Sequence, residues 1–127
     1  MYIIKGLITE KDYKETYEAL FIGENDKPLL VFIQDCLAGQ QVMLRYWITS
    51  AELTLQELEK LTVMKLLGMC DVEFFERYSE PTGYLRTDEE FKVGGHDIHA
   101  ELKDSVGKYL YMEISVATNC TSGSRKC

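Results

Sequence analysis

Residues 42–50 have the sequence VMLRYWITS, in which two sets of side chains alternate. The even-numbered set is Val42, Leu44, Tyr46 and Ile48, and the odd-numbered set is Met43, Arg45, Trp47 and Thr49. Successive side chains of a strand point to opposite faces of its sheet, so this stretch predicts a strand with two chemically different faces. Arg45 and Trp47 share one of them.

Further strands are predicted on both sides of this one. Residues 2–8, YIIKGLI, are β-branched and apolar, and residues 28–36, PLLVFIQDC, form the continuous apolar run of a central strand buried on both faces. Residues 70–80 and 84–93 flank the turn sequence PTG and predict a hairpin rich in acidic and aromatic residues. A last strand is predicted in KYLYMEISVA, with alternate apolar residues facing the core.

Three capping motifs predict helices. The capping box at Thr9–Asp12 predicts a helix that ends at Gly23, although residues 16–22, TYEALFI, also fit a strand paired with 28–34. The capping box at Thr54 predicts a second helix that continues to Gly68. Asp97 predicts a third, closed by Gly107.

These elements predict an α+β protein. A chain of 127 residues fits one domain, which we place at residues 1–117, followed by a flexible polar tail at 118–127. The expected architecture is a mostly antiparallel sheet of about five or six strands, with two or three helices packed on it. Cys36 and Cys70 are expected in the core.

A cytoplasmic location is expected. The N-terminus lacks the pattern of a signal peptide, and no run approaches the roughly 20 apolar residues of a membrane span. The four cysteines include no C-x-x-C pair, which argues against a zinc knuckle or a disulfide framework. For a protein encoded by a phage or mobile element, the compartment would be the host cytoplasm.

Both histidines lie in residues 92–108, KVGGHDIHAELKDSVGK. His96, Asp97 and His99 are weak metal-ligand candidates, because the spacing of three matches no recognised zinc motif. In the structural interpretation, Gly94 and Gly95 turn the chain and Asp97 caps the helix that follows.

Catalytic signatures are lacking in the sequence. It has no G-x-S-x-G elbow and no phosphate-binding glycine motif, so we expect neither an enzyme nor a cofactor. A small metal-dependent enzyme at His96, Asp97 and His99 is the least favoured alternative.

The net charge of −7 is concentrated in one third of the chain, since residues 71–104 carry ten acids and four bases. An acidic surface repels nucleic acid and anionic membranes but attracts basic proteins. We therefore predict a non-enzymatic inhibitor that occupies the nucleic-acid-binding surface of a nuclease or similar partner, as an anti-CRISPR-like phage protein or a nuclease-toxin immunity protein would. The predicted partner-binding acids are Asp71, Glu73, Glu76, Glu80, Asp88, Glu89 and Glu90.

Aromatic and arginine side chains are the second group of binding candidates, because they dominate the energetics of protein interfaces. Arg45, Trp47, Tyr78 and Tyr84 are candidate anchors, although for the first two we favour a structural interpretation, in which Trp47 packs under a helix and Arg45 extends past it. An alternative function is a small-molecule or nucleotide-binding sequestering oligomer, whose pocket between subunits is lined by Arg45, Trp47 and tyrosines.

Overall fold

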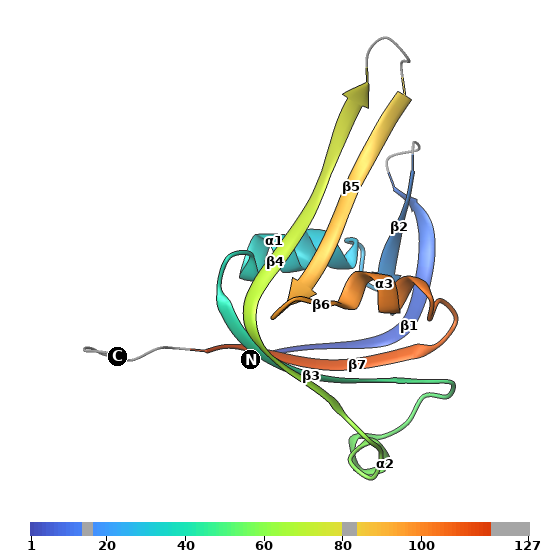
Figure 1. Ribbon diagram of the computed structural model, residues 1–127. Coiled ribbons are helices and arrows are strands. Elements are labelled where there is room, and N and C mark those ends of the chain that lie inside the picture. Colours follow the sequence, from blue (N-terminus) through green and yellow to red (C-terminus); the bar gives the residue numbers. More distant parts are fainter. Residues whose placement is uncertain (14–16, 80–83, 118–127) are drawn as a thin grey trace, which may run out of the picture.

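One antiparallel sheet forms the frame of the protein (Figure 1). The computed structural model describes residues 1–13, 17–79 and 84–117, and within these ranges it contains seven strands and three helices. The strands are β1 (Tyr2–Tyr13), β2 (Tyr17–Ile22), β3 (Gln41–Thr49), β4 (Met64–Ser79), β5 (Tyr84–Val93), β6 (His96–Asp97) and β7 (Tyr109–Val116). Their order in the sheet is β2-β1-β7-β3-β4-β5-β6.

The sheet curves because its two long strands each change partner midway. Tyr2–Leu7 of β1 pair with β7, and Ile8–Tyr13 pair with β2. In the same way, β4 pairs with β3 up to Met69 and with β5 from Cys70 onward. The pairs β1–β2 and β4–β5 therefore rise on the same side of the central strands and enclose a hollow (Figure 1).

Close glycine contacts allow both bends. A Cβ atom added to Gly6 would lie 2.6 Å from Cα of Gly23, and one added to Gly68 would lie 2.6 Å from Cα of Gly94. Real side chains do not approach a backbone so closely, so only glycine permits these two contacts.

The core fills the hollow. α1 (Leu29–Leu37) and α3 (Ile98–Lys103) lie on the inner face of the sheet (Figure 1), and their buried side chains belong to one core cluster with inward-facing residues of β3 and β7. The apolar residues of β3 and β7 that face inward are buried: Val42, Leu44, Leu110, Met112 and Ile114. Cys70 is buried and Cys36 packs against the core, as predicted. Burial raises the pKa of the Cys70 thiol to about 11, with a smaller contribution from Asp71.

The predicted fold class is confirmed, with one strand more than the upper expectation. β3, β7 and the β4–β5 hairpin match the predicted strands, and Asp97 caps α3 as expected. α3 ends at Lys103, before the predicted stop at Gly107. No helix within the described residues is long and apolar enough to cross a membrane.

The predicted strand at 28–36 is wrong, because this segment forms α1. Leu29, Leu30, Ile33 and Leu37 are buried, and Val31, Phe32 and Cys36 also pack against the core. A helix enclosed by a curved sheet is apolar on most of its surface, so it lacks the polar face that normally marks a surface helix.

The favoured helix over residues 9–23 is also wrong. Residues up to Tyr13 continue β1, and Tyr17–Ile22 form β2, so the strand alternative for 16–22 is nearer the structure. Its expected partner was 28–34, whereas the true partner is the second half of β1.

The capping box at Thr54 is confirmed, but the predicted helix is much too long. Thr54 and Glu57 exchange the expected hydrogen bonds, and α2 spans only Leu55–Leu58. β4 begins at Met64 and pairs six residues with β3. If the helix continued to Gly68, the backbone N–H and C=O groups of β3 that bond to β4 would have no hydrogen-bonding partners. Unlike α1 and α3, α2 lies on the outer face of the sheet (Figure 1).

Candidate functional site

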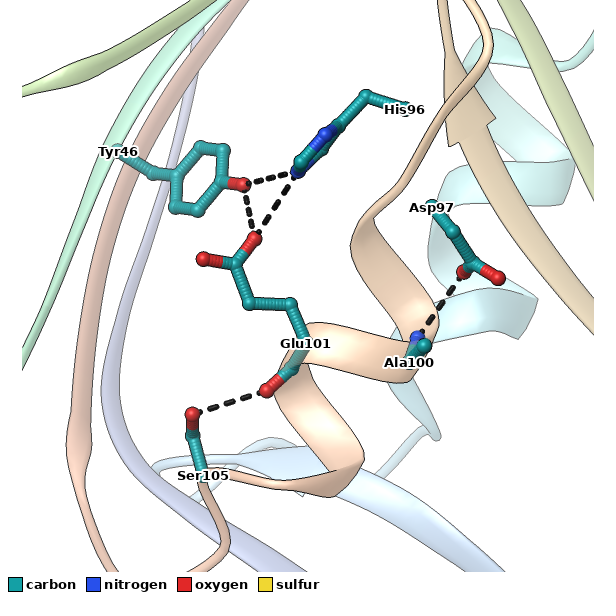
Figure 2. A network of polar contacts seen from close by, with 6 residues as sticks. All are labelled: Tyr46, His96, Asp97, Ala100, Glu101 and Ser105. Atoms are coloured by element: carbon teal, nitrogen blue, oxygen red, sulfur yellow. Dashed lines mark hydrogen bonds and ion pairs between the residues drawn. The ribbon is translucent and has the colours of Figure 1, made fainter.

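The two histidines bind different carboxylates. His96 Nε2 lies 3.2 Å from both the Tyr46 hydroxyl and Glu101 Oε1 (Figure 2). His99 Nε2 lies 3.1 Å from Glu89 Oε2, with both side chains mostly buried. Asp97 accepts a hydrogen bond from the Ala100 amide, which fixes it as the cap of α3 (Figure 2). His96, Asp97 and His99 are thus occupied separately, and the described residues contain no group of three or more metal ligands.

Tyr46, His96 and Glu101 form a polar cluster in which the three side chains point toward one another (Figure 2). The Tyr46 hydroxyl donates to Glu101 Oε1, which joins β3 to α3, while His96 comes from β6. Burial, the hydrogen bond to Glu101 and the charge of Glu101 raise the pKa of Tyr46 well above its ordinary value. The phenol therefore stays protonated and acts as a donor rather than a base. This cluster ties α3 to the sheet.

A small cavity adjoins this cluster. It has a volume of about 260 Å³, and its lining includes Tyr46, Trp47, Met64 and Glu101. Trp47 is 4% exposed, and its indole N–H is buried without a hydrogen-bond partner among the described residues. The volume is below the range of roughly 300–1,000 Å³ typical of ligand pockets.

Arg45 stands at the centre of a second polar cluster, on the outer face of the sheet. Its Nε donates to Glu113 Oε1 at 2.6 Å, and its Nη2 lies 3.4 Å from Glu59. The guanidinium also lies over the Trp47 ring, 5.0 Å from the ring centroid. The hydrogen bond from Arg45 is the largest cause that lowers the pKa of Glu113.

This geometry confirms that Arg45 and Trp47 share a face, but it changes their roles. Trp47 packs edge-to-face with Tyr111 and is too buried to anchor a partner. Arg45 is held by two carboxylates and lines a different cavity from the one that Trp47 lines. The two cavities formed by described residues thus separate Arg45 from Trp47.

The predicted acidic surface is divided between the two faces of the β4–β5 hairpin. Asp71 is opposite Lys92 and Glu73 is opposite Glu90, on the face that points outward. Glu89 is opposite the buried Phe74 on the inward face, where it binds His99. Asp71, Glu73 and Glu90 are thus the outward-facing acids among the described side chains, and we call them the outer acidic group.

The remaining candidates cannot be assigned to a face. Glu80 lies outside the described residues, and the structure describes only the backbone of Glu76, Tyr78, Tyr84 and Asp88. The tail predicted at 118–127 also lies outside the described residues.

Sequence reasoning missed two residues that organise these clusters, Glu101 and Glu113. A signal for the first was present, because Tyr46 interrupts an otherwise apolar strand face and a buried tyrosine hydroxyl needs a partner. No local signal identifies Glu113 as the partner of Arg45, since the two residues are 68 positions apart.

Comparison with known proteins adds no relative. The chain matches no family model, no curated protein and no solved structure.

Proposed function

We propose that the protein is a non-enzymatic inhibitor that covers a basic, nucleic-acid-binding surface of a partner protein. The observation that carries this proposal is the pairing of Glu73 with Glu90, two outward-facing acids directly opposite each other on adjacent strands. Asp71 extends the same face by one step along β4. The outer acidic group is the contact surface.

The shape of the hairpin favours such a contact. β4 and β5 continue well beyond the central strands and project from the body of the protein (Figure 1). Residues 70–93 contain seven acids and three bases, so this segment carries −4 of the total charge of −7. A projecting, negatively charged hairpin attracts a basic partner at long range, and its carboxylates can bind the arginine and lysine side chains of that partner.

The Glu73–Glu90 pair destabilises the free protein. Like charges directly opposite each other destabilise a sheet, and Lys92 compensates only Glu90, at 3.5 Å. A cation from a partner would remove this repulsion, which gives the complex a stabilising contribution that the free protein lacks.

Two biological settings fit this mode of action. A phage anti-defence protein would block a nucleic-acid-guided nuclease complex, and an immunity protein would neutralise a nuclease toxin encoded beside it. In either setting the protein acts in the cytoplasm, where its nucleic-acid-handling partner works. Genes next to that of this protein identify the partner to purify for the test.

The test uses the double variant Glu73→Lys/Glu90→Lys and titration calorimetry against the purified partner. We expect the Kd of the original protein to rise steeply with salt, because exposed charges are screened within about 10 Å at 0.1 M. The double variant should bind roughly tenfold more weakly or worse, the change expected when a single interfacial contact worth about 1.4 kcal/mol is lost. The partner's nucleic acid should compete with the inhibitor.

A matched control distinguishes the effect of where the charges lie from the effect of the net charge of the protein. Glu24→Lys/Glu52→Lys reverses two exposed acids outside the hairpin and changes the net charge equally. Binding of this control should stay close to that of the original protein. Equal affinity of the hairpin variant and the control would refute the proposed contact surface. Glu89 is unsuitable for this test, because its substitution removes the bond to His99.

A further inference from the structure

The outer face of the sheet bears a group of exposed apolar side chains, which we call the outer patch. It consists of Met1, Ile3, Met43, Leu67 and Met69, which are 79, 53, 54, 62 and 45% exposed. Pairing places them on one face, because Met43 is opposite Leu67 and Gln41 is opposite Met69, while Ile3 is opposite Glu113. Such a group on a surface is typical of a binding site.

The outer patch borders a groove on the outer face of the sheet. This groove has a volume of about 440 Å³, and its lining includes Met1, Met43, Arg45, Lys65, Leu67 and Glu113. Three of the five methionines of the chain belong to the outer patch. Methionine side chains are flexible and polarisable, so they adapt well to an opposing apolar surface.

Among the described residues, the segment that carries α2 covers one part of the outer face. There Leu58 is 2% exposed and shares a small cavity with Tyr109 and Tyr111. The described residues leave the outer patch uncovered. The exposed apolar area is therefore local to one part of this face.

Charge indicates what covers the outer patch. The charged residues that line its groove are Arg45, Lys65 and Glu113, and Asp71 follows Met69 on the same face of β4, so this region is close to neutral in a chain of −7. Arg45 and Glu113 bind each other, whereas Lys65 and Asp71 have no ion-pair partner among the described residues. The face thus offers both signs, and a second copy of the same face can supply charges complementary to each.

We propose that two copies of the chain associate through their outer patches as a twofold symmetric dimer. In a symmetric contact each copy presents the same surface, so a near-neutral apolar face is the one through which two molecules of charge −7 meet with least repulsion. The pairs β1–β2 and β4–β5 rise on the side of the central strands where α1 and α3 lie (Figure 1), so the far ends of both hairpins remain free. This dimer does not depend on the proposed inhibitory function.

The test is sedimentation velocity of the whole chain at protein concentrations of about 1–100 µM, a range that spans weak and strong interfaces. We expect a species of twice the chain mass of 14.6 kDa. Salt should leave the dimer unchanged or strengthen it, because screening reduces the repulsion between two acidic molecules. Binding through the outer acidic group should show the opposite salt dependence, so the two proposals can fail separately.

Three variants locate the interface. Leu67→Glu and Met43→Glu each place a charge at an exposed position of the outer patch and should shift the protein to monomer, with an unchanged circular dichroism spectrum. Val106→Glu is the control, because Val106 is 45% exposed and follows α3, away from the outer patch. A monomeric original protein at the highest concentration overturns the proposal. So does a folded Met43→Glu or Leu67→Glu variant that dimerises as well as the control.

Discussion

Gly68 of β4 lies directly against Gly94, the first residue after β5, and this contact sets the angle at which the hairpin leaves the sheet. A Cβ atom on Gly68 would lie 2.6 Å from Cα and 2.8 Å from N of Gly94. The bend therefore depends on two residues 26 positions apart that both lack side chains.

The first prediction concerns this contact. Gly68→Ala should lower the free energy of unfolding by about 1–3 kcal/mol, the usual cost of forcing atoms into an occupied space. Urea unfolding followed by circular dichroism measures the loss. Val106→Ala is the control, since it truncates a side chain that is 45% exposed and lies away from the outer patch, and it should change stability by less than about 0.5 kcal/mol. Equal stability of the two variants would mean that the glycine contact is not close.

The second prediction tests the link between β3 and α3. Tyr46→Phe removes the hydroxyl that donates to Glu101 and should cost about 1–2 kcal/mol, because a hydrogen bond to a charged group is lost. The effect is limited because Glu101 is 36% exposed and water can replace the phenol. Tyr109→Phe is the control, as its hydroxyl has no hydrogen bond to the described residues. Thermal unfolding of both variants gives the comparison.

The third prediction concerns acid stability. Because Arg45 lowers the pKa of Glu113 below its usual value of 4.5, this carboxylate contributes stability above pH 4.5 that is lost as the pH falls through the lowered pKa. Glu113→Gln should therefore be less stable than the original protein at neutral pH, and the difference should shrink in acid. Urea unfolding measured from neutral pH into the acid range checks this. A constant difference across that range would contradict the prediction, and Glu52→Gln provides the exposed control.

The fourth prediction follows from the like-charge pair on the hairpin. Glu73→Gln should stabilise the free protein by about 0.2–1 kcal/mol, because it removes a repulsion between directly opposite residues. Glu90→Gln should gain less, since it also removes the ion pair with Lys92. The urea midpoints of the two single variants test this order. A loss of stability in Glu73→Gln would show that the pair is not repulsive.

Two of the three local capping motifs were predicted correctly, whereas the third, at Thr9–Asp12, lies in β1, where pairing with β2 replaces the predicted helix. Thr54 and Asp97 cap their helices because a side-chain oxygen meets backbone N–H groups three residues away. β3 and β7 were recognised because one of their faces is buried and the other is not, which leaves an alternating pattern.

The candidate site was predictable only in part, as the seven acids show. Their concentration in one segment is a property of the sequence, but their faces depend on the register of β4 and β5. That register directs Glu73 and Glu90 outward and Glu89 inward, to His99. A shift of one residue would reverse these directions, because side chains alternate along a strand.

The sequence by itself determined the α+β class, the helix starts at Thr54 and Asp97, the alternating strands β3 and β7 and the location of the acidic segment. Tertiary structure decided that residues 29–37 form a helix, because their continuous apolar surface is compatible with burial as either helix or strand. It also decided that Met64–Met69 extend β4, because β3 needs a hydrogen-bonding partner along its edge. In both segments contacts with distant residues overrode the local preferences, which are weak compared with tertiary packing.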